Sequence, residues 1–315
     1  MPARRRKIKN RNREKKSFPL KAISYILLIL IPLFLLLYVN ITRKYWNGKD
    51  KISVAVRNPE GGVDVIIFDP VVEEIVQISI PGNTEVEVAK GLGVWKLGSV
   101  WELGKRQDLG ELLLTRTLAK HFKFPVFIWA DYPASGFSKG RMFDTLKATF
   151  LPYSTNLGVG DKISIGFFSL SVKNPKRFEI PLENTGYIKK LTLSDGEEGY
   201  IVSGALPQEL AVYFVDPNFE ENAFRVGIKD GTGVYGLATD MGSILEVMGG
   251  KITSIEKVDG PENVNDLGCE VRGRNNVSDK EYCILSPTGS PKQLFLYRLC
   301  ASELLLDIIS PIIYA

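Results

Sequence analysis

The chain has 315 residues, of which 44% are hydrophobic, and a formal net charge of +4. Residues 1–21 hold ten Lys/Arg against one acid, Glu14, a charge of +9, so residues 22–315 sum to −5 (+4 minus +9). This distribution excludes a polyanion- or nucleic-acid-binding body by bulk charge. His121 is the one histidine, which excludes multi-histidine metal sites, and we interpret it as structural.

Residues 22–41 form an uninterrupted uncharged apolar segment. Twenty helical residues at about 1.5 Å each reach about 30 Å, the thickness of one hydrocarbon core. The basic flank is expected to stay in the cytoplasm, which places residues 42–315 outside. We therefore predict a basic cytoplasmic tail (1–21) and a single transmembrane signal anchor (22–41) in the cell membrane. A cleaved signal peptide is the alternative, but no small-residue cleavage site follows.

The first part of the expected ectodomain alternates strand and helix patterns. Strands are expected at 51–56, 63–68 and 74–80, and again at 125–129. A helix is expected at 108–122, with Asp108 as N-cap and Glu111 completing a capping box. This order predicts a mixed α/β layer.

The second part divides into a weakly patterned stretch and a small α/β unit. Residues 162–172, 187–193, 200–203 and 210–215 are interpreted as strands, and 217–222 as a linker. Beyond it we expect strand 224–228, helix 234–248, strand 251–258, strand 283–286 and helix 292–309. The sequence thus predicts an α/β ectodomain at 47–220 and a small C-terminal α/β domain at 224–310.

Three cysteines lie in the C-terminal part. Outside the membrane an odd count suggests one bridge and one free thiol. Cys269 and Cys283 flank a polar loop and are the candidate disulfide, whereas Cys300 lies in an apolar helix pattern. Their spacing is not that of a metal ribbon.

The glycine-rich turn at 231–236 has two interpretations. Gly231, Thr232, Gly233 and Gly236 spell G-x-G-x-x-G after a strand and before a helix, the written form of a dinucleotide fingerprint. The unit is short for a dinucleotide domain, and Asp230 places an anion where a pyrophosphate would approach. The alternative is a structural turn whose amides form an anion-binding loop at the helix N-terminus.

The same stretch resembles the LytR C-terminal domain. Residues 226–238 read VGIKDGTGVYGLA, and 245–255 continue LEVMGGKITSI. The resemblance implies a strand, a D-G-T-G turn, a helix opened by G-L-A and a second strand. It covers about 35 residues closely.

The amino-terminal segment resembles the LytR-CpsA-Psr family. Residues 62–70 read GVDVIIFDP and 78–84 read ISIPGNT, against the family's S-I-P-R-D-T, while 96–99 read KLGS. The resemblance implies an anchored protein that transfers a glycopolymer from a polyprenyl pyrophosphate to peptidoglycan, with Mg²⁺. Asp64 and Lys96 stand at matching positions and are the catalytic candidates; Asp64 would be a metal ligand only if Mg²⁺ is bound.

Gly82 and Asn83 replace the family's arginine and aspartate. Glycine cannot supply the planar, charged fork that suits a pyrophosphate. We therefore expect a degenerate family relative, a non-catalytic binding or scaffolding protein of the cell envelope. The alternatives are an active Mg²⁺-dependent transferase that draws on Arg106 or Arg141, and a dinucleotide-binding ectodomain.

Overall fold

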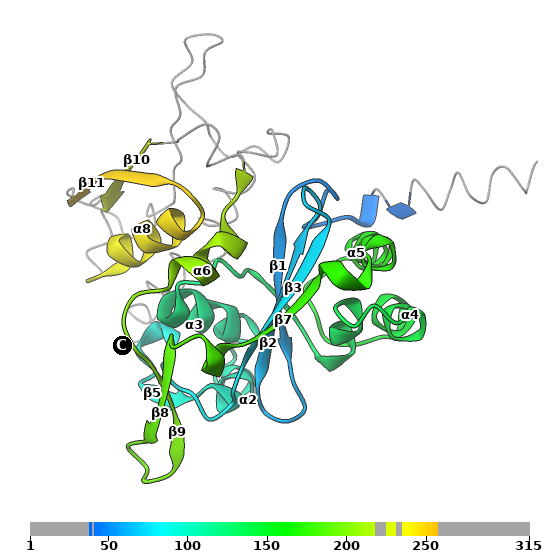
Figure 1. Ribbon diagram of the computed structural model, residues 1–315. Helices are drawn as coiled ribbons and strands as arrows, with labels where there is room; N and C mark the ends of the chain where they lie inside the picture. The colour runs from blue at the N-terminus through cyan, green and yellow to red at the C-terminus, as the bar shows by residue number, and fades with distance from the viewer. Residues whose placement is uncertain (1–37, 40, 218–224, 231–234, 258–315) are drawn as a thin grey trace, which may run out of the picture.

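The computed structural model describes residues 38–39, 41–217, 225–230 and 235–257. They are organised around a five-stranded sheet of order β6-β1-β2-β3-β7 (Figure 1). Its strands are β1 (Ile52–Arg57), β2 (Val63–Asp69), β3 (Glu74–Ile80), β6 (Ile128–Ala130) and β7 (Arg177–Pro181). The three first strands are an antiparallel meander, while β6 pairs parallel with β1 and β7 parallel with β3. The sheet is therefore mixed, as expected for this α/β pattern.

Strand β2 is central, and all seven of its residues are buried. Its apolar run has no polar alternation because helices cover both faces of the sheet. Helices α2 (Leu97–Arg106) and α3 (Leu112–Phe122) pack on one face, and α4 (Met142–Phe150) and α5 (Val159–Ser171) on the other (Figure 1).

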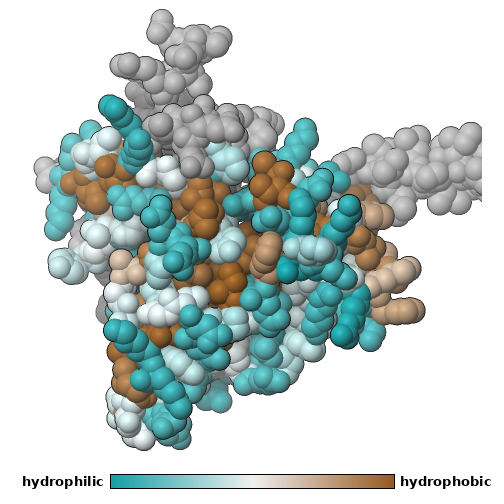
Figure 2. All heavy atoms as spheres, in the orientation of Figure 1, coloured by the Kyte–Doolittle hydropathy of each residue, from teal (hydrophilic) through white to brown (hydrophobic). Residues whose placement is uncertain are grey.

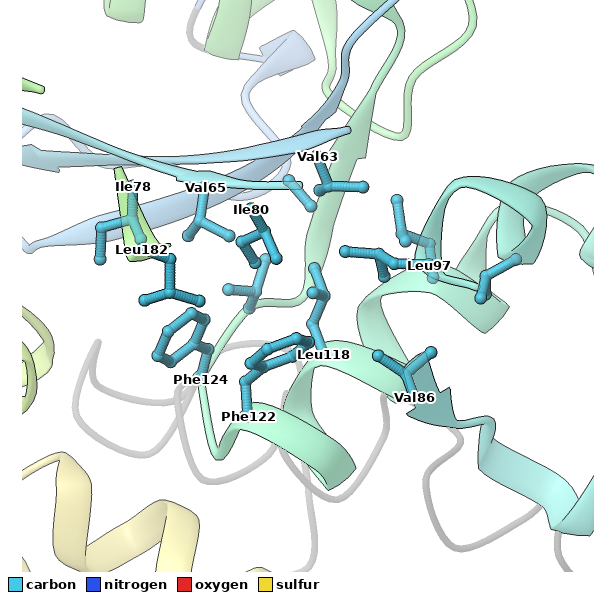
Figure 3. Close-up of a cluster of buried hydrophobic side chains, with 14 of the residues drawn as sticks. Val63, Val65, Ile78, Ile80, Val86, Leu97, Leu118, Phe122, Phe124 and Leu182 are labelled. Carbon is cyan, nitrogen blue, oxygen red and sulfur yellow. The ribbon is translucent and has the colours of Figure 1, made fainter. Parts of the chain in front are cut away.

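The larger core lies between the sheet and α2 and α3. Figure 3 shows β-branched side chains of β2 and β3 pointing toward aliphatic and aromatic side chains of α3 and of the segment after it. Phe124 also stacks on Phe214, with ring centroids 4.7 Å apart. The buried members labelled in the figure are Val63, Val65, Ile78, Ile80, Val86, Leu97, Leu118, Phe122, Phe124 and Leu182.

The second core lies between the sheet and α4 and α5, and it includes the chain that enters the domain. Trp46 is buried there, edge-on to Phe168 of α5 with ring centroids 5.5 Å apart. Phe68 of β2 contacts both rings and Phe137 as well.

Short elements connect these layers. A small hairpin, β4 (Glu85–Glu87) and β5 (Val94–Lys96), precedes α2, and a second hairpin, β8 (Ile188–Thr192) and β9 (Glu198–Val202), follows β7. The remaining turns are η1 (Ala89–Gly91), η2 (Tyr132–Phe137), η3 (Asn174–Lys176), η4 (Leu182–Asn184), α6 (Gln208–Ala211) and η5 (Val212–Phe214).

A strand-helix-strand unit follows: β10 (Arg225–Asp230), α8 (Leu237–Val247) and β11 (Lys251–Lys257). The two strands are parallel, with α8 as their crossover. Gly236 is the N-cap of α8 and has φ +82°, a conformation that favours glycine. The order of elements expected here is confirmed.

Two of the four strands expected in the weakly patterned stretch are wrong. Residues 162–172 belong to helix α5, in which Ile165, Ser169 and Val172 are buried at helical spacing. Residues 210–215 form α6 and η5, which bury Leu210 and Phe214 four residues apart. Alternating β-branched residues resemble a strand locally, but the face that each segment can bury decides its form.

The expected capping box at Asp108 is also wrong. Asp108 has φ +53°, and α3 begins at Leu112 after Glu111, with no side-chain cap. Gly110 is in the left-handed region as well, so a tight turn separates α2 from α3.

Within the part of the chain that the structure describes, no helix combines the length and the apolarity that a membrane span requires. The predicted anchor at 22–41 lies almost wholly outside that part, as do Cys269, Cys283 and Cys300. Gly231, Thr232 and Gly233 are outside it too, with the elements expected at 283–286 and 292–309.

Candidate functional site

Asp64 lies near the start of β2, between Val56 of β1 and Ser79 of β3. Only 4% of its surface is exposed. Burial raises the pKa of its carboxyl group above the ordinary value, while hydrogen bonds with Ser79 and Gln77 oppose that rise. The carboxyl is therefore biased toward its protonated form relative to a solvated aspartate.

The groups around Asp64 form a polar cluster on one face of the sheet. Ser138 Oγ donates to Gln77 Oε1 at 2.6 Å, and Gln77 Nε2 donates to Ser79 Oγ at 3.3 Å. Glu179, opposite Gln77 on β7, raises the pKa of Asp64, and Lys139 lowers it. A glutamate and a lysine thus act on Asp64 in opposite directions.

The cluster offers a cation two carboxyl groups, the buried Asp64 and the exposed Glu179 of β7. Mg²⁺ binds through ionised carboxylate oxygens and keeps several waters, so a ligand must be charged and accessible. Asp64 is buried with a raised pKa. Across the described residues, no three Asp, Glu, His or Cys side chains converge as a metal site.

Three glycines meet around residue 82. Gly61 lies in the turn between β1 and β2, Gly82 follows β3, and Gly98 lies in the first turn of α2. A Cβ at Gly82 would come closer than 3.0 Å to the carbonyl oxygen of Gly61, and a Cβ at Gly98 would meet the same oxygen at 2.5 Å. Gly98 N donates to Gly82 O at 2.9 Å. Backbone fills this position, so no side chain can start from residue 82 without movement of the chain.

The β8–β9 hairpin covers the neighbouring residue, Asn83. Asn83 Nδ2 donates to Glu198 O at 3.1 Å, and Tyr200 N donates to Asn83 O at 3.3 Å. A Cβ at Gly199 would clash with Asn83 O. Asn83 therefore holds strand β9 in place.

Lys96, the last residue of β5 and the N-cap of α2, forms ion pairs with the turn of the same hairpin. Its Nζ lies 2.6 Å from Asp195 Oδ2 and also pairs with Glu197, both in the turn between β8 and β9. Hydrogen bonding to Asp195, then to Glu197, raises the pKa of Lys96. Because its partners differ from those of Asp64, the structure does not join the two candidates in one constellation.

The other residues singled out have structural environments. His121 Nδ1 accepts a hydrogen bond from Glu87 N at 3.3 Å, and burial lowers the pKa of the imidazole. Arg106 is the last residue of α2, and Arg141 is the N-cap of α4. Tyr235, beside the glycine loop, is 97% exposed.

Sequence reasoning missed Asp161, the most completely bonded carboxylate in the described residues. It lies in the first turn of α5, is fully buried, and accepts from the amides of Lys44, Tyr45 and Trp46 at 2.9–3.1 Å. It also accepts from Gly158 N at 2.9 Å. The sequence feature that could have identified it is an acidic residue three positions after the glycine that precedes the helix, a position typical of a capping box.

The chain is similar in structure, over about half its length, to LytR-CpsA-Psr proteins. It matches TagT of Bacillus subtilis with 14% identity and a TM-score of 0.36, covering 51% of this chain and 88% of TagT. It matches B. subtilis TagV with 11% identity and a TM-score of 0.38, covering 49% and 92%. It also matches the LytR-CPS2A-psr family protein YwtF (TagT) with bound octaprenyl pyrophosphate lipid. The identity is 13% and the TM-score 0.36, and the match covers 51% of this chain and 87% of that chain. No family profile and no curated protein sequence matches the chain.

Proposed function

We propose that this protein is a membrane-anchored extracytoplasmic protein of the cell envelope that binds or organises cell-wall material without transferring it. Its parts are a cytoplasmic tail (1–21), an anchor (22–41), a LytR-CpsA-Psr-like domain (47–220) and a LytR C-terminal-like domain (224–310). The support for the first domain is the motif resemblance at 62–70 and 78–84, and for the second the resemblance at 226–255.

The close packing of Gly61, Gly82 and Gly98 supports the non-catalytic part of the proposal. A transferase that releases a polyprenyl phosphate needs preorganised positive charge on the departing group. At residue 82 the backbone of Gly61 occupies the space from which an arginine would extend. Lys96 is committed to Asp195 and Glu197, and Asp64 is buried with a raised pKa. Each side chain with a matching position thus has a structural role.

The transfer test uses the full chain in lipid nanodiscs, a polyprenyl pyrophosphate glycan as donor and purified peptidoglycan as acceptor, with and without Mg²⁺. We expect no transfer above empty nanodiscs, for the protein or for Asp64→Asn. Mg²⁺-dependent transfer that Asp64→Asn abolishes would establish the transferase alternative and overturn the proposal.

The binding arm measures co-sedimentation of the same protein with peptidoglycan sacculi. Saturable binding is expected, because an exposed aromatic such as Tyr235 is suited to stack on sugar rings. Tyr235→Ser is expected to weaken it, and Tyr132→Ser, on the first domain, serves as the control. Absence of binding by the parent protein would contradict the binding role, and a thermal shift on addition of NAD would favour the dinucleotide alternative instead.

A further inference from the structure

We propose that the outer surface of α4 and α5 lies in the lipid headgroup region of the bilayer, so that the domain rests on its own membrane. This aromatic face consists of Met142, Phe143, Phe150, Leu151, Val159, Phe167 and Leu170. The inference rests on the membrane anchoring within the proposed function and is independent of whether the protein transfers glycans.

Both helices are apolar on two sides. Helix α4 buries Ala148 against the sheet but exposes Phe143 (78%) and Phe150 (69%), seven residues apart on one stripe. Helix α5 buries Ile165 but exposes Phe167 (71%). The outward face of a surface helix in water is normally polar. A contiguous exposed apolar surface marks an interface with another apolar phase.

The two stripes form one surface. A Cβ at Gly166 of α5 would clash with Thr149 Oγ1 of α4, so the Thr149 side chain packs directly against the backbone of α5. Figure 2 shows hydrophobic residues along the right-hand edge of the molecule, over the region of α4 and α5 labelled in Figure 1.

The described residues at the end of the predicted anchor contact α5, which carries part of this face. A Cβ at Gly160 of α5 would clash with Val39 O, and Arg43 Nε donates to Ser164 Oγ at 3.0 Å. Arg43 N also donates to Val39 O at 3.1 Å. Val39, Thr42 and Arg43 are therefore in direct contact with α5, and the apolar residues 22–37 that precede them are expected in the bilayer. The aromatic face is held close to the membrane surface because no linker separates it from the anchor.

The charges near the face favour lipid over a protein as the occupant. Residues 141–173 carry Arg141, Lys147, Lys162 and Lys173 against Asp144 and the buried Asp161. Lys147 lies between Phe143 and Phe150 on α4, where its alkyl stem can follow apolar surface while the ammonium group reaches a phosphate. Aromatic rings mixed with lysines are typical of elements that lie in a membrane interface.

The test places an environment-sensitive fluorescent amino acid, genetically encoded, at position 143, 150 or 167 of the full chain. The protein is reconstituted in phosphatidylcholine–phosphatidylglycerol vesicles with a spin label on the lipid chain near the headgroup. Because an interfacial helix is buried about 5–10 Å, we expect blue-shifted emission and roughly twofold quenching at these positions. Controls at the exposed Val94 and Leu191, on the distant hairpins, are expected to show neither.

The outcomes separate the possible occupants. Equal, weak quenching at all five positions would overturn the proposal. Protection from aqueous iodide without lipid quenching would show a protein partner or a second copy on the face, which also overturns it. Vesicle flotation reports anchoring separately, and failure to float would overturn both anchoring and this inference.

A matched variant removes the face and leaves the core. Phe143→Ser, Phe150→Ser and Phe167→Ser together change only exposed rings. With the probe at Leu170, this variant is expected to lose lipid quenching while still floating with the vesicles. Unchanged quenching in the triple variant would contradict a role for these rings.

Discussion

At the scale of single residues, Gly82 shows how the space around a residue, and not its backbone conformation, can require glycine. Gly82 is not required by backbone conformation, since its φ is not in the left-handed region. It is required by space, because Gly61 and Gly98 approach it backbone to backbone. This local packing would have to open before any side chain could be accommodated at residue 82.

A first prediction concerns that packing. Gly82→Ala is expected to lower the free energy of unfolding by about 2 kcal/mol or more, because overpacking forces backbone to shift. Gly242→Ala is the control, since a Cβ there meets nothing closer than 3.5 Å and alanine favours a helix. Chemical denaturation measures both; equal stability of Gly82→Ala and the parent would refute the close contact. Gly82→Arg is expected to be less stable still and to gain no transfer activity.

A second prediction concerns the buried carboxyl of Asp64. Its pKa is raised in the folded protein, so the folded state holds the proton more tightly than the unfolded state. The contribution of this group is then fully present below the unfolded pKa of 3.8 and is lost as pH rises through the folded pKa. Each tenfold difference in the acid constant corresponds to about 1.4 kcal/mol.

Asp64→Asn removes this dependence while keeping hydrogen-bonding capacity toward Ser79 and Gln77. The difference in free energy of unfolding between the parent and Asp64→Asn is expected to shift against the parent as pH rises from 3.8 through the folded pKa of Asp64. The difference is expected to stay at this shifted value at pH 7. Denaturant titrations at several pH values provide the measurement, with Asp144→Asn on exposed α4 as control. Parallel stability curves for the parent and Asp64→Asn would count against the raised pKa.

At the scale of elements, α5 shows how distant parts of the chain are tied together. Asp161, in the first turn of α5, accepts hydrogen bonds from the backbone amides of residues 44–46. Near the other end of the helix, Arg177 donates to the carbonyl oxygens of Ser138 at 2.9 Å and Val172 at 3.1 Å. The sequence predicted a strand here because Ile, Ser, Phe and Val alternate. The local pattern could not distinguish a strand from a helix. The structure shows a helix because the residues that it buries are spaced four apart.

A third prediction follows from the Asp161 network. Asp161→Asn replaces a charged acceptor with an amide whose NH₂ group faces donors, so a loss of about 2–4 kcal/mol is expected. The segment that it holds contains Arg43 and Lys44, both trypsin sites. Limited proteolysis is expected to cut there faster in the variant, whereas Asp144→Asn retains the parent rate. Unchanged cleavage in Asp161→Asn would show that other contacts hold the segment.

At the scale of the whole molecule, the strand-helix-strand unit rests on α3. Ala119 of α3 is buried with Ile244, Leu245 and Met248, and Lys123 Nζ pairs with Asp240 Oδ1 at 2.6 Å. Asp216 N donates to Met248 O at 3.0 Å. A small apolar contact and one partly exposed ion pair thus join this unit to the first core.

A fourth prediction tests this contact. Ala119→Glu buries an unpaired charge against α8, and a loss of about 3 kcal/mol or more is expected to release the unit. Hydrogen exchange of Leu237–Val247 is then expected to accelerate before that of β2. Lys123→Met removes only the partly exposed ion pair and is expected to change exchange little. If α8 exchanges in Ala119→Glu as in the parent, the unit is stable without α3.

The sequence by itself determined the strand meander, the fully buried β2, the helix that ends at Phe122, and the strand-glycine turn-helix order near residue 230. These follow from apolar periodicity and from glycine and proline at turns, which are local properties. The sequence also predicts a membrane span at 22–41 and, through the family resemblance, a glycine in place of an arginine at residue 82.

Only the tertiary structure decided the rest of the candidate site. It showed that Gly82 is enclosed by Gly61 and Gly98, that Lys96 holds a hairpin about 100 residues further along the chain, and that Asp161 binds the entering segment. It also showed that α4 and α5 are apolar on the side away from the core. The physical reason is that enclosure, pairing and exposure are properties of neighbours distant in sequence, and no local pattern specifies which neighbours meet.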